Sequence, residues 1–296
     1  MPGDAIPIVA NPVSGRGRGR EMALRVADAL AFRGNTASIH WTEDSPQTER
    51  VARELAGHAK MIVACGGDGT VHNVANALLE SGTAMAVAPA GRGNDLARML
   101  EVPADPDGIA SMIVAGRRRS IDLGRATGGD GRTRAFCTVA ACGFDAELAR
   151  RLVHGGPVGG PWAYVYGTLM TLLSYEPRRA RFEGDFGVFD GEFFLAATCK
   201  TSMYGGGIRI APGASLDDGL LRICIIRPIS RPVVIALFRR VRRGTHLDHP
   251  KVSLHKTARL TITAPSPLDL YADGEMLAST PVTIDVLPRA LEVIVP

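Results

Sequence analysis

The stretch Met61–Thr70 reads MIVACGGDGT and continues into Val71–Glu80, VHNVANALLE. Its apolar or small residues from Met61 to Cys65 predict a buried strand, and the spacing after Thr70 predicts a helix with one apolar face. A strand, a glycine turn and a helix in this order favour phosphate binding. The reason is that glycines let the backbone approach an anion and a helix N-terminus presents unpaired N–H groups. A tight turn without any ligand is the alternative.

Asp68 lies inside this glycine turn. An aspartate would repel a bare phosphate, so the turn needs a cation if it binds one. Mg²⁺ prefers oxygen ligands and bridges phosphate oxygens. We therefore expect Asp68 to meet phosphate through Mg²⁺.

Length and composition indicate a globular protein. A chain of 296 residues predicts two domains, with one large domain as the alternative. Its apolar share of 46% is enough for a sizeable core. The net charge of +4 is too small to indicate nucleic acid binding, and with 5% aromatic residues we expect no stacking platform for bases.

The cysteines and the N-terminus point to the cytoplasm. Five cysteines form no C-x-x-C pair and lie mostly in apolar contexts, so we expect them to be reduced, buried and structural. No cysteine and histidine spacing suits zinc. The first residues, MPGDAIPIVANP, lack the basic and long apolar regions of a signal peptide.

Strands and helices alternate in the first part of the chain, which predicts a doubly wound parallel sheet. Ser45 is expected to cap the second helix, with Pro46 at its first position. The predicted strands are Ile6–Ala10, Thr36–Trp41, Met61–Cys65 and Thr83–Ala88, and the helices are Glu21–Phe32, Pro46 to about Ala56, the one after Thr70, and Leu96–Leu100.

Three glycine-containing loops follow strands of this sheet: Asn11–Gly15, Gly66–Thr70 and Gly91–Asp95. Ligands of such sheets bind beyond the carboxyl ends of the strands, so we expect the three loops to converge. Three convergent loops favour a nucleotide more strongly than one.

The pattern becomes mainly β after about Ser120, so we place one domain at residues 1–125 and a second, antiparallel and sandwich-like, at residues 126–296. Helices are predicted at about Ala163–Ser174 and Val233–Arg243. The predicted strands are Ala135–Ala141, Glu192–Ala197, Leu220–Ile226, Ala258–Ala264, Leu268–Ala272, Val282–Val286 and Leu291–Val295.

A series of motifs along nearly the whole chain resembles the catalytic domain of the diacylglycerol kinase and sphingosine kinase superfamily, and in particular its soluble bacterial lipid kinases. The motifs are NPVSG at Asn11–Gly15, GGDGT at Gly66–Thr70, PAGRGND at Pro89–Asp95, IDLG at Ile121–Gly124, ACGFDAEL at Ala141–Leu148, YGGGIRIAPGASLDDGLL at Tyr204–Leu221 and DGE at Asp273–Glu275. The resemblance implies an N-terminal α/β nucleotide domain, a C-terminal β-sandwich domain, and an active site with ATP in the cleft between them.

The resemblance also implies which residues contact the nucleotide: Asn11, Thr42, Gly66, Gly67, Asp68, Gly69, Thr70, Val71, His72, Gly91, Arg92, Asn94 and Asp95. Two of these depart from the family pattern. Arg92 stands where Thr is common, and a guanidinium cannot copy a hydroxyl. His72 stands where close relatives often have Asn, and a lone His at a helix start is usually structural.

Three acidic residues carry the implied chemistry. Glu275 would be the general base for a lipid hydroxyl, Asp273 an orienting or metal-linked partner, and Asp68 the residue that serves Mg²⁺. A structural Mg²⁺ would be held by the Asp218 carboxylate and the carbonyls of Ser215 and Leu220. Without the resemblance, Asp273–Glu275 and Asp217–Gly219 would be plain turns.

The resemblance implies ATP- and Mg²⁺-dependent phosphorylation of a lipid hydroxyl, with diacylglycerol the first choice of acceptor. A sphingoid base or another lipid alcohol stays open, as do an NAD kinase-like enzyme and a non-catalytic lipid-binding relative. We expect peripheral association with the inner face of the membrane, and relatives make a homodimer plausible. Candidate lipid-facing residues are Trp162, Tyr164, Tyr166, Leu169 and Leu172, near arginines 178, 179, 181, 239, 240, 242 and 243, although a core helix and solvated charges explain them as well.

Overall fold

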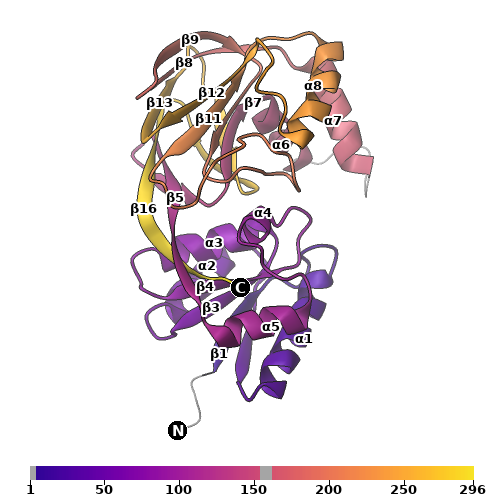
Figure 1. Cartoon of the computed structure of the whole chain (residues 1–296), viewed down its shortest axis with the longest axis vertical. Coiled ribbons are helices and arrows are strands. Elements are labelled where there is room, and N and C mark those ends of the chain that lie inside the picture. The colour runs from indigo at the N-terminus through magenta and orange to yellow at the C-terminus, as the bar shows by residue number, and fades with distance from the viewer. Residues whose placement is uncertain (1–4, 154–161) are drawn as a thin grey trace. The chain divides into compact units, whose positions relative to one another are not determined.

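The computed structural model describes residues 5–153 and 162–296, and the chain forms two compact units. The first unit comprises the chain up to Leu123 together with Leu216–Asp218 and Leu287–Pro296. The second unit comprises Gly124–Ser215 and Gly219–Val286. The chain therefore leaves the first unit and returns to it at its end (Figure 1).

The first unit is built on parallel strands, as predicted. Their order in the sheet is β2-β1-β3-β4, with each neighbouring pair parallel. This order places β1, β3 and β4 side by side, and these are the strands that the three glycine loops follow. The strands are β1 (Ile6–Ala10), β2 (Ala37–Trp41), β3 (Met61–Gly66) and β4 (Ala84–Pro89).

Helices pack on this sheet because alternate strand residues point to opposite faces. On one face Ile8, Val63 and Ala86 share a buried core with Leu30 and Ile113 from two helices. The helices are α1 (Arg18–Phe32), α2 (Ser45–Leu55), α3 (Asp68–Leu78), α4 (Asp95–Met99) and α5 (Pro106–Ala115), with α1 and α5 in contact and α2 against α3 (Figure 1).

Two helix starts in the first unit differ from the prediction. Asp44, and not Ser45, is the N-cap of α2, and its carboxylate accepts a hydrogen bond from the Gln47 backbone at 2.7 Å. The helix α5 was not predicted, although Asp105 caps it in the same way and Pro106 is its first residue. The shared signal that sequence reasoning overlooked is an aspartate one or two residues before a proline in the first turn.

The second unit contains an antiparallel sheet of six strands, in the order β12-β11-β10-β7-β14-β15. Its central strands β7 and β10 are buried along their whole length. The strands are β7 (Val139–Gly143), β10 (Leu195–Cys199), β11 (Leu221–Ile226), β12 (Val252–Thr257), β14 (Asp269–Ala272) and β15 (Glu275–Ser279).

A second layer of strands covers one face of this sheet and confirms the predicted sandwich. Phe136, Phe182 and Phe193 from this layer share one core with Ala196 and Ile223 of the six-stranded sheet. The layer consists of the end of β5 (Arg118–Gly128), β6 (Thr133–Phe136), β8 (Arg178–Gly184), β9 (Gly187–Phe193), β13 (Arg259–Thr263) and the start of β16 (Val282–Ile294).

Three helices pack on the opposite face of the six-stranded sheet: α6 (Phe144–Val153), α7 (Trp162–Ser174) and α8 (Arg231–Arg243). Leu195 and Cys199 of β10 belong to this helix-side core, whereas Ala196 between them belongs to the sandwich core. Because both faces are covered, the central strands carry continuous apolar runs.

Three predicted strands of the second domain are placed differently. The strand predicted at Glu192–Ala197 covers the end of β9 and the start of β10. The strand predicted at Ala135–Ala141 is interrupted, with β6 ending at Phe136 and β7 starting at Val139. The strand predicted at Leu291–Val295 is the end of β16, where Val293 pairs in parallel with Met85 of β4. The alternation of apolar residues indicates a strand but does not specify its partner, so this segment belongs to the first unit.

Candidate active site

The three glycine loops of the first unit are in contact with one another. A Cβ atom on Gly91 would lie 2.5 Å from the Gly67 Cα atom, and one on Gly15 would lie 1.9 Å from the Ala90 carbonyl oxygen. The guanidinium of Arg18 also donates to the Gly91 carbonyl at 2.7 Å. The backbones of the loops thus approach too closely for side chains, as their common position after β1, β3 and β4 predicts.

Asp68 fastens two of these loops together. One of its carboxylate oxygens accepts from the Asn94 backbone N–H at 2.9 Å and the other from the Asp95 backbone N–H at 2.7 Å. A Cβ atom on Gly93 would lie 2.5 Å from the same carboxylate. The aspartate in the glycine turn therefore has a structural task that its sequence position did not reveal.

Asn94 closes its own loop from within. Its side-chain oxygen accepts from the Gly91 N–H at 2.9 Å, and its side-chain nitrogen donates to the Gly91 carbonyl at 3.0 Å. Asn94 has a left-handed backbone with φ of 52°, which asparagine tolerates better than most residues. Its predicted role as a nucleotide contact would come in addition to this one.

The helix α3 starts directly at the glycine turn. Its N-cap is Gly67, whose lack of a side chain leaves the first-turn amides without a capping group from that residue. First-turn amides of a helix have no acceptor within the helix, and the helix dipole favours negative charge there. The turn Gly66–Thr70 can therefore bind an anion through its backbone.

Three of the other predicted nucleotide residues, Thr42, Val71 and His72, have buried side chains. Thr42 is fully buried, and its hydroxyl accepts from the Thr48 hydroxyl at 2.8 Å. His72 is also fully buried, as a structural histidine would be, and Val71 is 5% exposed. Arg92 is exposed, and the Asn11 side-chain oxygen accepts from the Val13 N–H at 3.0 Å. Any contact of Thr42, Val71 or His72 with a ligand would have to use the backbone.

In the second unit, Asp273 and Gly274 form the two-residue turn between β14 and β15. Their φ angles are 52° and 91°, the left-handed values that an Asp-Gly hairpin turn adopts. Glu275 is the first residue of β15, pairs with Ala272 across the hairpin, and is partly exposed. Asp-Gly-Glu is thus a true turn, and it presents a carboxylate at a fixed position on a strand.

Asp273 attaches this hairpin to the connection between β6 and β7. Its carboxylate accepts from the Cys137 N–H at 2.8 Å and makes a very short hydrogen bond with the Thr138 hydroxyl, which donates. Asp273 is 8% exposed, so these bonds are shielded from water. Such an arrangement suits the orienting role predicted for Asp273. It also explains why the strand predicted at Ala135–Ala141 is interrupted at these two residues.

The segment that resembles a structural Mg²⁺ loop has a lysine at one end. The buried Lys200 ammonium donates to the Leu220 carbonyl at 3.1 Å, and Asp217 pairs with Arg119 at 2.8 Å. In residues 5–153 and 162–296, no three His, Cys, Asp or Glu side chains are grouped to hold a metal. The predicted Mg²⁺ site has only one such side chain, Asp218, together with the carbonyls of Ser215 and Leu220. The lack of a three-residue group therefore does not test it, and it stays a prediction.

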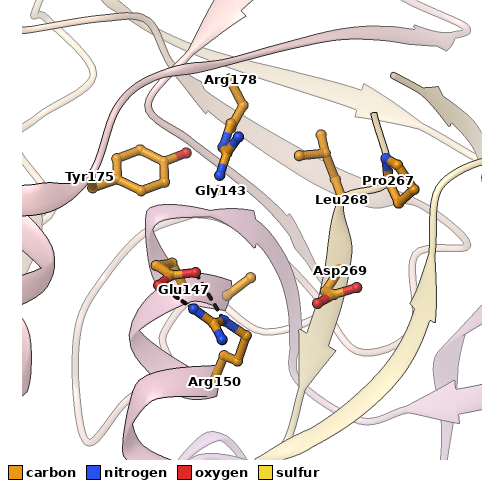
Figure 2. Close-up of a pocket in the computed structure, with 9 residues that line it drawn as sticks. Gly143, Glu147, Arg150, Tyr175, Arg178, Pro267, Leu268 and Asp269 are labelled. Atoms are coloured by element: carbon orange, nitrogen blue, oxygen red, sulfur yellow. Dashed lines mark hydrogen bonds and ion pairs between the residues drawn. The ribbon is translucent and has the colours of Figure 1, made fainter. Parts of the chain in front are cut away.

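A cavity of about 250 Å³ opens within the second unit beside α6. Glu147 and Arg150 of α6 form an ion pair at 2.8 Å on its wall, and this pairing lowers the pKa of Glu147 (Figure 2). The buried Tyr175 hydroxyl, another part of the wall, has no hydrogen-bond partner in the described residues. Arg178 and Asp269 add further charge, so the cavity is suited to a polar group.

Asp145 and Tyr204 link two of the sequence motifs, ACGFDAEL and YGGG. The Tyr204 hydroxyl donates a very short hydrogen bond to the Asp145 carboxylate. Burial raises the pKa of Asp145 to about 6, and the bond from Tyr204 counteracts part of that rise. The five cysteines are all buried with no disulfide, as predicted, and burial raises the pKa of Cys65 and Cys142 to about 12.

The side chains of Trp162 and Tyr164, two of the predicted lipid-facing residues, lie outside the described residues. Leu172 belongs to the helix-side core, whereas Leu169 is 50% exposed. In the part of the chain that the structure describes, no helix is long and apolar enough to cross a bilayer.

Comparisons with known proteins agree with this fold. Residues 5–126 match the family described as the diacylglycerol kinase catalytic domain. Residues 138–295 match the YegS C-terminal NAD kinase beta sandwich-like domain. A solved structure from Bacillus anthracis strain Sterne superimposes with a TM-score of 0.81 and 21% identity, covering 100% of this chain and 96% of that one.

Curated relatives support the same family along nearly the full length. A diacylglycerol kinase of Mycobacterium tuberculosis is 30% identical over 98% of this chain and 95% of its own length. One from Bacillus subtilis strain 168 is 29% identical, with the same coverage. The chain therefore belongs to the diacylglycerol kinase family, whose members are lipid kinases.

Proposed function

We propose that this kinase transfers the γ-phosphoryl group of ATP to a lipid hydroxyl in the presence of Mg²⁺, and that the lipid is diacylglycerol, which becomes phosphatidic acid. The observation that supports it best is the packing of three glycine loops after adjacent parallel strands, with Asp68 joining two of them. Glycines in such loops let backbone amides reach phosphate oxygens.

In the first unit, the nucleotide would be held mainly by backbone groups. The amides of Gly66–Thr70 and of the α3 start would receive phosphate oxygens, and exposed Arg92 would add a positive charge. Arg18, which the sequence did not single out, supports this set because it bonds the Gly91 carbonyl. Since the loops are already in contact, little reorganisation would be needed on binding.

The residues present are compatible with Mg²⁺ on the nucleotide. An ionised carboxylate has about four acceptor sites, so the two backbone amides on Asp68 do not exclude a metal ligand role. Bound there with ATP, Mg²⁺ would neutralise the developing charge on the phosphates.

In the second unit, Glu275 would act as the general base. Its carboxylate would accept the proton of the lipid hydroxyl as that oxygen attacks the γ-phosphorus. Asp273 would not touch the reacting atoms. It would hold the hairpin that carries Glu275 through its bonds to Cys137 and Thr138.

The polar cavity beside α6 is our candidate for the polar part of the lipid. Asp269 on its wall is the first residue of β14, the strand that leads into the Asp273–Glu275 hairpin. Four residues of strand span about 13 Å, a distance within the reach of one lipid molecule.

The outer face of α8 is a candidate for contact with the membrane surface. Ile235 and Phe238 are 55% and 46% exposed, and exposed Arg239 and Arg242 continue the same stripe at helical spacing. Basic residues next to an apolar stripe attract anionic lipid headgroups by about 1 kcal/mol each. Vesicle sedimentation would test this face, because Arg239→Glu with Arg242→Glu should weaken binding to anionic vesicles without changing ATP turnover on micellar lipid.

Labelled ATP tests the proposed reaction directly. The purified protein should transfer label to diacylglycerol in mixed micelles when Mg²⁺ is present, and mass spectrometry of other lipid alcohols would rank the acceptors. Label in NADP after incubation with NAD would instead favour an NAD kinase. Lipid binding without ATP turnover in any lipid presentation would favour a non-catalytic relative.

A further inference from the structure

Lys200 is a fully buried lysine at the end of β10. It directly follows Cys199, the last residue of that strand, and is 0% exposed. Only four of the 34 Lys and Arg residues of the chain are lysines, and the other three are Lys60, Lys251 and Lys256. A lysine is almost never fully buried unless its charge is compensated, so Lys200 needs a structural reason.

One partner of its ammonium group is a carbonyl of the predicted Mg²⁺ loop. Lys200 Nζ donates to the Leu220 carbonyl oxygen at 3.1 Å. The resemblance assigns this same oxygen, with Ser215 and Asp218, to a structural Mg²⁺. A cation is therefore already present on one of the three predicted ligands.

Mg²⁺ is disfavoured at this oxygen because it would lie close to the positive charge of Lys200, and not because the oxygen lacks room for a second partner. A carbonyl has two lone pairs and could accept two partners. However, Mg²⁺ binds oxygen at about 2.0–2.1 Å, so it would lie roughly 4 Å from the Lys200 nitrogen. Like charges at this separation repel each other, and water screens the fully buried Lys200 side chain poorly. The residues present therefore do not fit the metal that the resemblance implies.

The backbone of Lys200 continues the connection toward the Asp273 turn. Its N–H donates to the Thr138 carbonyl at 2.8 Å, and the Thr138 hydroxyl donates to the Asp273 carboxylate. Asp273 and Gly274 then form the turn that precedes Glu275. A continuous series of hydrogen bonds thus runs from the Leu220 carbonyl through Lys200 to the hairpin of Glu275.

We propose that the Lys200 ammonium serves as a built-in cation in place of a structural Mg²⁺, and that it holds the end of the Ser215–Leu220 loop against the strands that support the Asp273 turn. Lys200 is then a positioning residue. Its effect on turnover rests on the proposed function, whereas its effect on metal dependence and stability does not.

Thermal unfolding without nucleotide tests the metal part of the proposal. The melting temperature of the wild type should be the same in EDTA and in millimolar Mg²⁺. Lys200→Met, which keeps the length of the side chain and removes its charge, should lower the melting temperature by at least roughly 2–4 °C. Lys251→Met, a change at an exposed lysine, is the matched control.

Either of two melting results would overturn the proposal. One is a wild type that Mg²⁺ stabilises by several degrees, with the stabilisation absent in Asp218→Ala. The other is Lys200→Met with the melting temperature of the wild type. If Lys200→Met does not fold, Lys200→Gln takes its place, because it retains an N–H donor without the charge. Stoichiometric binding of Mn²⁺ to the nucleotide-free wild type, lost in Asp218→Ala, would also refute the proposal.

Turnover separates positioning from mere stability. Below its melting temperature, Lys200→Met should lower kcat by tenfold or more and leave the KM for ATP unchanged, because the nucleotide loops are in the first unit. An unchanged kcat would refute the link to Glu275. A wild type without kinase activity would refute the proposed function and leave the melting results to decide the role of Lys200.

Discussion

The glycine loops of the first unit and the Asp273 hairpin of the second are each held by an aspartate, but they expose different chemistry. Asp68 receives two backbone amides and joins loops whose glycines let the backbones approach one another closely. Asp273 receives one amide and one hydroxyl, and the group presented next to it is the Glu275 carboxylate. The glycine loops should therefore be disturbed by side-chain atoms added to a glycine. The Asp273 hairpin should instead be disturbed by a substitution that removes the charge of Glu275 and keeps its size.

The strongest test of this difference is Glu275→Gln, which keeps the size of the side chain and removes the base. We expect kcat to fall by roughly 10²–10⁴, the range for lost acid–base assistance, while ATP affinity stays within a few-fold. Steady-state kinetics and nucleotide titration measure both quantities, and exposed Glu192→Gln on β9 is the control. A strongly raised dissociation constant for ATP at near-normal kcat would make Glu275 a nucleotide or metal ligand.

Asp68→Asn should affect both structure and activity, because asparagine offers one acceptor oxygen to the two amides of Asn94 and Asp95. An amide left unsatisfied costs about 1–3 kcal/mol, so both the free energy of unfolding and turnover should fall. Urea denaturation and an ATP assay measure this, with exposed Asp28→Asn as the control. Wild-type turnover in the variant would refute the role of Asp68.

Gly91→Ala adds one carbon where the Gly67 Cα atom would be 2.5 Å away. Overpacking costs typically about 1–3 kcal/mol, and because the loops must separate, the affinity for ATP should fall more than kcat. The matched control is Gly191→Ala, whose new carbon would meet its nearest neighbour at 3.7 Å. Equal stability and ATP affinity in both variants would show that the loops do not need this close approach.

An effect on stability alone is expected for Asp145, whose pKa of about 6 lies above its ordinary 3.8. The folded state then binds the proton more tightly than the unfolded state. The contribution of Asp145 to stability is therefore highest below about pH 4, falls as pH rises from about 4 to 6, and is constant above. Asp145→Asn lacks this loss and should gain about 3 kcal/mol on the wild type across that window. Urea denaturation at several pH values measures it, and a constant difference would contradict the shift.

Local patterns in the sequence predicted much of the first unit. The strand, turn and helix around Gly66–Thr70 and the contact of three loops follow from alternating elements and from the rule that parallel strands end on one side. The sequence did not show that Asp68 bonds Asn94 and Asp95, because Asp68 lies more than 25 positions before both and bonds their backbone amides.

The second unit was predicted less completely, since its contacts are mostly non-local. The strand β8 and the helix α6 were not predicted, and the interruption at Cys137 and Thr138 depends on Asp273, more than 130 residues later. The bond from Lys200 to Leu220 was also not foreseen, because a lysine in an apolar run gives no sign of its partner.

The return of the chain to its first unit has a consequence for how the protein is made. Val293 completes its pairing with Met85 only after the whole second unit has been synthesised. Until then, β4 carries one exposed strand edge on an otherwise assembled sheet, and such edges are prone to pair with other chains. The end of β16 thus pairs with this edge only at the end of synthesis. Synthesis that stalls before residue 287 would release an aggregation-prone intermediate.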